Sequence, residues 1–116
     1  MDKQFWWKVG CLSTGLAVVL GAFGAHGLKK MVSDQYLLDI WNKGVLYHFI
    51  HSLGILISIS GPAVNPRGAV LSFAAGTSIF SGSLYLMTLT NKRWLGAITP
   101  IGGVLFIAGW VLLAFS

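Results

Sequence analysis

Four long stretches without a charged side chain dominate this sequence. Residues 9–28, 46–64, 69–90 and 94–116 contain no Lys, Arg, Asp or Glu. A helix of about 20 such residues crosses the ~30 Å hydrocarbon layer of a bilayer, and inside lipid the backbone must satisfy its own hydrogen bonds. No strand-like alternation is present. We therefore predict an all-α integral membrane protein, a bundle of four transmembrane helices at about 9–28, 44–60, 69–90 and 95–115.

The composition agrees with a single membrane domain covering residues 1–116. Hydrophobic residues make up 55% of the chain and charged residues 9%, against about 25% charged residues in ordinary soluble domains. The net charge of +5 is scattered over termini and loops, so no basic patch indicates nucleic-acid binding, and the lipid bilayer is the expected surrounding. The start of the chain loosely resembles a signal peptide, but we expect an uncleaved first helix.

Charge also suggests an orientation. Four spans place both termini on one side of the membrane, here called side A, and the opposite side is side B. Side A carries Lys3, Lys8 and Arg67, and side B carries Lys29, Lys30, Lys43, Lys92 and Arg93. Because Lys and Arg concentrate in cytoplasmic loops, we predict that side B faces the cytoplasm of a bacterium, with the inner (cytoplasmic) membrane as the location. The alternative is the mitochondrial inner membrane, with side B in the matrix.

The segment between the first two spans has the pattern of an amphipathic helix. Ser33-Asp34-Gln35 offers an N-cap. The apolar residues after it fall on one helical face, namely Tyr36, Leu37, Ile40 and Trp41. Two interpretations remain open: a helix lying on the side B surface, or an extension of the second span, with Gly44 as the bend.

Two segments with prolines mark other boundaries. The stretch 61–68 contains Pro62 and Pro66 and predicts a break between the second and third spans. Pro100 follows Thr99 at the start of the fourth span. It is either a first-turn proline after a capping threonine or the site of a kink.

Small residues recur at helical spacing in three of the spans. Membrane helices associate through close packing at such residues, because apolar side chains gain little by leaving lipid for one another. We predict helix packing at Ser13, Ala17, Gly21 and Ala25 in the first span, at Ala74, Ser78 and Gly82 in the third, and at Gly102 and Gly109 in the fourth. These stripes indicate a tight bundle.

Polar side chains collect toward the side B half of the spans. An imidazole in hydrocarbon is costly unless it has a partner or a task, and a shallow depth lowers that cost. We therefore expect one polar layer near the side B surface, to which all four helices contribute. Its candidate members are His26, Tyr47, His48, His51, Ser81, Tyr85 and Thr99.

The three histidines raise the question of a metal site. Three neutral imidazoles can bind a transition metal, whereas the ordinary interpretation is that each forms hydrogen bonds across helices. We favour the second interpretation, and predict no metal site, no cofactor and no catalytic residues. The three carboxylates, Asp2, Asp34 and Asp39, all fall outside the predicted spans.

Four motifs together resemble a known family. They are GAFGAHGLK (residues 21–29), YHFIHSLG (47–54), IFSGSLYLMTLT (79–90) and ITPIGGVLFIAGW (98–110). In this order they resemble the small four-helix membrane proteins that include eukaryotic transmembrane protein 256 and its bacterial relatives, and they read closer to the bacterial members. The resemblance implies a multi-pass protein of the inner membrane and implies no reaction. Its recurring residues would be Gly21, Gly24, His26, Gly27, His48, His51, Ser81, Gly82, Tyr85, Pro100, Gly102 and Gly103.

Three functions remain in competition. The first is a non-enzymatic structural or accessory membrane protein, whose partners would be other membrane proteins or further copies of the chain; it is favoured because no catalytic set is present. The second is a small transporter or channel in which histidine carries the proton, since the pKa of an ordinary imidazole lies near neutrality. The third is a metal or lipid-head-group site formed by His26, His48, His51 and Tyr85. We expect that the protein is not an enzyme.

Overall fold

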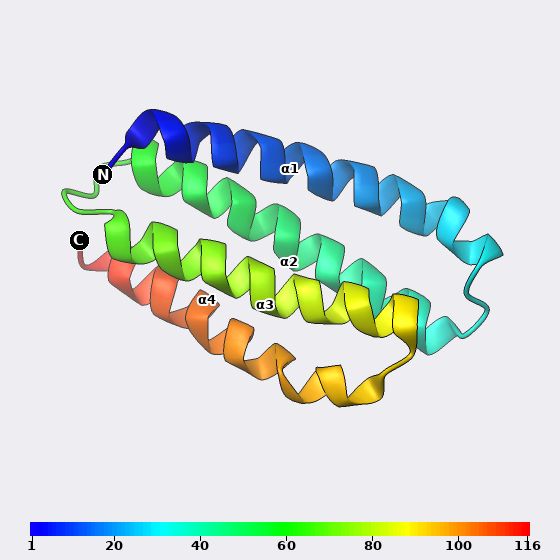
Figure 1. Cartoon of the computed structure of the whole chain (residues 1–116). Coiled ribbons are helices and arrows are strands. Elements are labelled where there is room, and N and C mark those ends of the chain that lie inside the picture. Colours follow the sequence, from blue (N-terminus) through cyan, green and yellow to red (C-terminus); the bar gives the residue numbers. More distant parts are fainter.

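Every regular element of the chain is helical. The computed structural model describes residues 1–116. The elements are α1 (Lys3–Ala25), the short 3₁₀ helix η1 (Gly27–Lys30), α2 (Gln35–Ser60), α3 (Arg67–Thr90), a second 3₁₀ helix η2 (Arg93–Ala97) and α4 (Thr99–Ala114). The long helices run side by side, and both termini lie at the same end of the molecule (Figure 1). The prediction of an all-α protein with four long apolar helices is confirmed.

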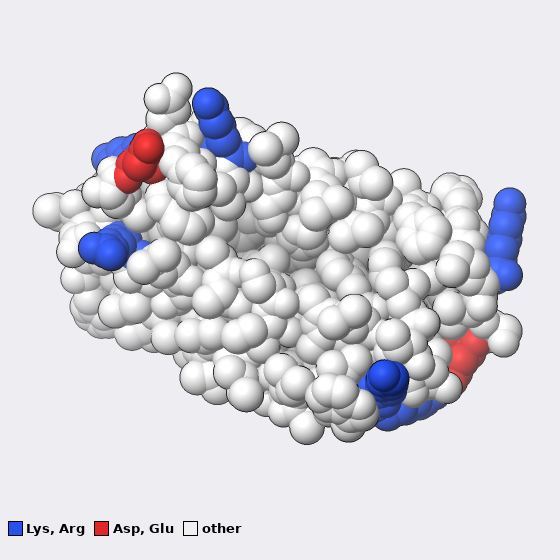
Figure 2. Space-filling model, in the orientation of Figure 1, with Lys and Arg blue, Asp and Glu red and all other residues white.

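The four helical segments are long and apolar enough to cross a membrane. They extend over Lys3–Lys30, Gln35–Ser60, Arg67–Thr90 and Arg93–Ala114. Charged side chains lie toward the two ends of the molecule, and a broad uncharged band separates them (Figure 2). This distribution fits a protein whose middle is surrounded by hydrocarbon and whose ends reach the head groups.

Two helices are longer at their N-terminal ends than we predicted. α1 begins at Lys3, because the carboxylate of Asp2 accepts a hydrogen bond from the Phe5 amide at 3.0 Å and caps the helix. α2 begins at Gln35, where Asp34 caps the Tyr36 amide at 2.9 Å. The amphipathic segment is therefore the first part of α2, and the alternative of a separate surface helix is wrong. Helix α2 continues through Gly44, whose position does not break it.

Single residues explain where α3 ends and where α4 begins. α3 ends where Asn91 adopts the left-handed conformation with φ 54°, which asparagine tolerates better than most residues. Pro100 lies in the first turn of α4, where a missing amide hydrogen does no harm. Pro100 is thus a first-turn proline and not a kink, although Thr99 forms no capping hydrogen bond.

The helices form a staggered row and not a closed bundle. Each long helix packs against the one before it in the chain, α1 on α2, α2 on α3 and α3 on α4, and no extensive contact joins α1 to α4. The Cα atoms extend over 47 × 26 × 17 Å, and the order of the row is visible in Figure 1. The outer sides of α1 and α4 are therefore left to the lipid.

The contact between α1 and α2 uses small residues with a heptad spacing. The buried residues of α1 are Gly10, Ala17 and Gly24. A Cβ atom at Gly10 would lie 2.5 Å from Leu56, and one at Gly24 would lie 2.7 Å from the Trp41 indole. A side chain at Gly10 or Gly24 would therefore displace the side chain of Leu56 or Trp41.

The predicted stripe on α1 follows this contact over only part of its length. Ser13 hydrogen-bonds to α2, Ala17 is fully buried, and a Cβ atom at Gly21 would lie 3.3 Å from Val45. Ala25 is exposed. A strict four-residue spacing turns by about 40° at each step around a helix with 3.6 residues per turn, so the stripe leaves the contact before it reaches Ala25.

Glycines also set the distance between α3 and α4. A Cβ atom at Gly102 would lie 2.5 Å from the backbone nitrogen of Phe80, and one at Gly109 would lie 2.6 Å from the ring of Phe73. The predicted packing residues on α3 are covered only in part. Ala74 packs against the apolar cluster that contains Ile55 and Phe106, whereas Ser78 is exposed and a Cβ atom at Gly82 would meet nothing within 4 Å.

Apolar clusters lie toward both ends of the row. One cluster joins α2, α3 and α4 near the α2–α3 loop and contains Ile55, Ile59, Ala69, Val70, Phe73 and Phe106. Another lies near the opposite end and contains Leu37, Ile40, Leu84, Met87 and Leu95. Between them the contacts are largely polar, and these polar contacts form the candidate site.

Candidate polar site between the helices

His48 belongs to a chain of hydrogen bonds that crosses three helices. It is buried at the middle of α2. Its Nε2 atom lies 3.0 Å from the Ser13 hydroxyl on α1, and its Nδ1 atom lies 2.9 Å from the Tyr85 hydroxyl on α3. Ser13 in turn hydrogen-bonds with Ser52, one turn further along α2, at 2.5 Å. Each of these four groups can both donate and accept, so the chain Ser52–Ser13–His48–Tyr85 is internally satisfied.

His51 belongs to a second, separate network. Its Nδ1–H donates to the backbone carbonyl of Tyr47 at 2.8 Å, and its Nε2 accepts from the indole N–H of Trp110 on α4 at 3.0 Å. The imidazole also stacks on the ring of Phe106, with centroids 3.5 Å apart. Both ring nitrogens are thus occupied, and the geometry defines a neutral imidazole with its proton on Nδ1.

Three hydroxyl groups tie α3 to its neighbours. Ser81 donates to the carbonyl of Gly44 at 2.7 Å, and Thr88 donates to the carbonyl of Leu37 at 2.9 Å, so both join α3 to α2. Ser83 and Thr99 share a hydrogen bond of 2.5 Å between α3 and α4. Interhelical bonds of this kind in membranes contribute about 0.6 kcal/mol each on average.

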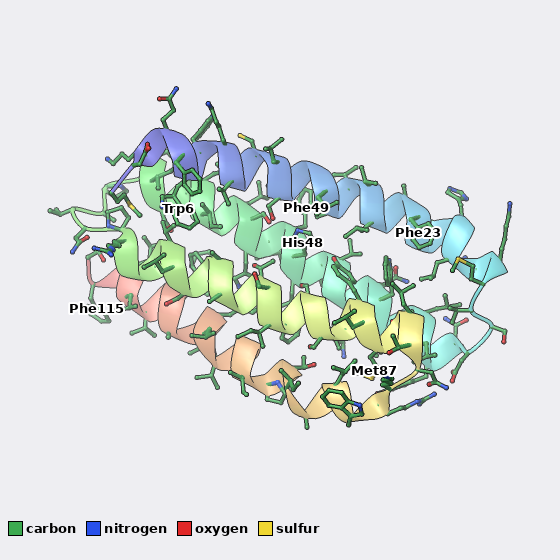
Figure 3. All side chains as sticks on the ribbon, in the orientation of Figure 1. Trp6, Phe23, His48, Phe49, Met87 and Phe115 are labelled. Carbon is green, nitrogen blue, oxygen red and sulfur yellow. The ribbon has the colours of Figure 1, made fainter.

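The depth of the site differs from our expectation. The helix that carries His48 extends from Gln35 to Ser60, so this residue falls at mid-length and not near side B. In Figure 3 His48 lies near the middle of the row, while Trp6 and Phe115 mark one end and Met87 the other. The expectation failed because the second span was taken to begin at residue 44, whereas the amphipathic segment continues the same helix.

The structure brings together some of the predicted polar residues and separates others. His48 and Tyr85 share one network, His51 and Tyr47 share the other, and Ser81 and Thr99 hydrogen-bond in their own interhelical contacts. His26 is exposed at the C-terminal end of α1, away from both networks. The polar layer is therefore several local contacts and not one cluster.

This arrangement bears on the metal hypothesis. No group of three His, Cys, Asp or Glu side chains is placed so that it could hold a metal ion. His51 has no free ring nitrogen, and His26 lies apart from the other two imidazoles. The geometry is that of hydrogen-bonded helices.

Sequence reasoning missed four members of the site. Ser13 had been assigned to packing alone, and Ser52, Trp110 and Thr77 had been assigned no role. A signal for Ser52 was available, because it lies one helical turn after His48. Trp110 gave no such signal, since tryptophan in a membrane helix is usually placed at the interface. The Thr77 hydroxyl is the one buried side-chain oxygen without a hydrogen-bond partner.

A small groove lies beside the His48 network, between α1 and α3. Its volume is about 260 Å³, and it is lined by Ser13, Leu16, His48, Thr77, Ser78, Ser81, Gly82 and Tyr85. Most of its lining residues are polar, but the surface that they expose in the groove is mostly apolar, because Ser13, His48 and Tyr85 turn their polar atoms toward one another.

These observations define a class of protein. Four helices are long and apolar enough to cross a membrane, the charges lie toward the two ends of the molecule, and the internal polar groups join neighbouring helices to each other. The chain is a multi-pass α-helical membrane protein.

Comparison with known proteins places the chain in a family. A family model described as a protein of unknown function (DUF423) matches residues 20–103, and the chain belongs to this family. It is 50% identical over 111 residues to a UPF0382 membrane protein of Staphylococcus haemolyticus, covering 93% of this chain and 90% of that protein. It is 44% identical over 114 residues to the UPF0382 membrane protein YwdK of Bacillus subtilis, covering 93% of this chain and 91% of YwdK. No solved structure matches.

Proposed function

We propose that this chain is a non-enzymatic membrane protein that acts as a structural or accessory partner of other membrane proteins or of further copies of itself. The observation that carries the proposal is that the buried polar groups of the chain are engaged in hydrogen bonds within the protein. Each buried polar side chain except Thr77 forms a hydrogen bond with another helix or with its own backbone. Polar groups used in this way serve the fold, as expected of a structural or accessory protein.

The positions of the acids support the same proposal. Asp2 and Asp34 cap helices, and Asp39 accepts a hydrogen bond from Gln35 at 2.7 Å on the surface of α2. No carboxylate lies beside His48 or His51, so neither imidazole has the acidic partner that general acid–base sites commonly use. The protein therefore offers contact surfaces and no reaction centre.

The bacterial relatives support a location in the cytoplasmic membrane. We propose this location for the chain, with side B toward the cytoplasm because of its five Lys and Arg residues. We also propose that the relationship extends to eukaryotic transmembrane protein 256, on the strength of the four motifs quoted above.

Site-specific photo-crosslinking in native membranes tests the proposal. A photoreactive side chain is introduced at Gly15 on α1 and, separately, at Gly82 on α3, because a Cβ atom at either glycine meets nothing within 4 Å. Ala17, which is fully buried against α2, is the matched control. We expect a discrete protein adduct from at least one of the two open positions and none from Ala17.

The same experiment has a clear negative outcome. If Gly15 and Gly82 yield only lipid adducts while the protein is folded and abundant, the chain has no stable protein partner on α1 or α3. The scaffold proposal would then be rejected.

A second candidate function is supported by the His48 network. The chain Ser52–Ser13–His48–Tyr85 has four groups that can each pass on a proton, and a groove lies beside it. A histidine-based proton carrier would use these groups. It ranks second because the four groups lie at mid-depth and reach neither end of the row.

Proton flux in liposomes decides between the two functions. Wild-type protein is compared with His48→Gln and with His51→Gln, which lies in the other network. Flux that falls only with His48→Gln would support transport. Absence of flux above protein-free liposomes, or equal flux in all three proteins, would remove this candidate.

A further inference from the structure

A second and larger groove runs between α2 and α4, and the proposed functions do not use it. Its deeper part has a volume of about 590 Å³, with Leu46, Tyr47, Ile50, His51, Phe80, Pro100, Gly103, Val104, Phe106, Ile107 and Trp110 around it. A further part of about 360 Å³ lies toward the end where α2 begins and α3 ends. Both parts are lined by Phe80 and Pro100, so they lie next to each other on either side of these two residues.

The deeper part of this groove suits a flexible apolar chain better than a helix. Membrane helices pack on one another through small residues, whereas most side chains here are large, such as Leu46, Ile50 and Ile107. From Pro100 to Trp110 the helix rises by roughly 15 Å, which is about half of the ~30 Å hydrocarbon layer. The deeper part is therefore long enough for one leaflet's acyl region, and its Trp110 end lies beyond His48 toward side A, where Trp110 bonds His51.

The other end of the groove carries a single free cation. Lys43 lines this end together with Tyr36, Ile40 and Thr99. The nearby Arg93 is neutralised, because its guanidinium lies 2.7 Å from the Asp34 carboxylate. Lys43 has no carboxylate within salt-bridge distance, since the pair of Arg93 and Asp34 is the one salt bridge of the chain.

An apolar groove next to an unpaired ammonium group has the chemistry of a lipid site. A lysine stem can extend along apolar surface while its charged head reaches the membrane interface. There it attracts anionic head groups, with which lysine interacts favourably. Lys43 lies between His48 and the side B end of α2, and side B carries most of the positive charge.

We propose that the α2–α4 groove binds an anionic phospholipid of the side B leaflet. The phosphate lies at Lys43, and one acyl chain lies along Phe80 and ends near Val104. The site is independent of the proposed function, because it uses a different face of α3 from the groove beside His48.

Native mass spectrometry of the detergent-purified protein tests this site. The protein is titrated with phosphatidylglycerol and, separately, with phosphatidylcholine of the same acyl chains. We expect preferential binding of phosphatidylglycerol. Lys43→Gln should weaken that binding about fivefold, the effect of one lysine near an anionic head group. Lys30→Gln removes a cation from the same side away from the groove and should leave binding unchanged.

A second variant tests the apolar part of the site. A Cβ atom at Gly103 would lie no closer than 3.9 Å to Phe80, so Gly103→Leu fills the groove without a clash and should abolish the preference for phosphatidylglycerol. Gly15→Leu is the control, because that position also has open space but lies on α1. If Gly103→Leu does not fold, the two lysine variants decide the matter.

Several results would overturn the proposal. Equal binding of the two lipids, or unchanged phosphatidylglycerol binding in Lys43→Gln, would show that this groove does not select an anionic lipid. A dimer that is lost in Gly103→Leu would show that a second copy of the chain occupies the groove instead.

Discussion

The substitution Gly102→Ala addresses the closest approach between two helices in this protein. The Cβ atom it adds would lie 2.5 Å from the backbone nitrogen of Phe80 and 2.8 Å from its Cα atom. These are backbone atoms of α3, which cannot rotate away as the end of a side chain can. The two helices must therefore separate by roughly 1 Å to reach ordinary van der Waals contact.

The magnitude follows from two opposing effects. Overpacking of a close contact destabilises by about 1–3 kcal/mol. Replacing glycine by alanine inside a helix has the opposite effect, up to about 1 kcal/mol in water. Gly103 provides a matched control, because alanine there gains the same helix propensity while its Cβ atom lies 3.9 Å from the Phe80 ring. We expect Gly102→Ala to be less stable than Gly103→Ala by about 1–3 kcal/mol.

The assay is reversible unfolding in mixed micelles with increasing dodecyl sulfate, followed by far-ultraviolet circular dichroism. Wild type, Gly102→Ala and Gly103→Ala are measured at the same protein and detergent concentrations. Equal midpoints for the two variants would refute the reasoning, because the proximity of Gly102 to the α3 backbone would then not limit the stability of the protein.

Three further predictions use the same assay. Trp110→Phe keeps the ring contacts but removes the hydrogen bond to His51, and should lower the free energy of unfolding by about 0.6–1.7 kcal/mol; an unchanged value would contradict the role given to this bond. Ser81→Ala removes an interhelical bond and should destabilise by about 0.6 kcal/mol, whereas Ser78→Ala, which removes a bond only to its own helix, should have little effect. Asp34→Ala removes the cap of α2 and should destabilise by about 1 kcal/mol, with only a small addition from its exposed ion pair; a neutral result would show that the cap does not matter.

Much of the fold could be predicted from the distribution of charge. The four uncharged stretches identify the four helices, and Asp34 marks the start of α2 through the chemistry of its side chain. The boundary error at α2 has a physical cause. Asp39 and Lys43 were taken to lie outside the membrane, and a charged residue on a helix does not reveal whether the helix ends there or continues.

The site was harder to predict because small angular differences decide contacts. His48 and His51 lie three positions apart, which places them about 60° apart around the helix. That difference sends His48 to the contact with α1 and α3 and His51 to the contact with α4. Helical periodicity identifies the shared side of α2, but only the arrangement of the row determines which neighbour each imidazole meets.

Spacing rules failed for a related reason. The four-residue stripe on α1 leaves the contact before Ala25, and the similar stripe on α3 packs at Ala74 but leaves Ser78 and Gly82 uncovered. A pattern on one helix carries no information about where its partner lies. Gly102 and Gly109, two turns apart on one face of α4, do lie against another helix, since a Cβ atom at either would meet Phe80 or Phe73.

The row arrangement has a consequence for how the protein is made. Because each helix packs on its predecessor, α2 can form its bonds to α1, including those of Ser13 and Trp41, while α3 is still being synthesised. Helices that wait for a distant partner stay exposed for longer during synthesis, and this chain largely avoids such waiting. The one hydrogen bond between α2 and α4 joins His51 to Trp110. This bond can form only after α4 has left the insertion machinery. It then ties the last helix to α2.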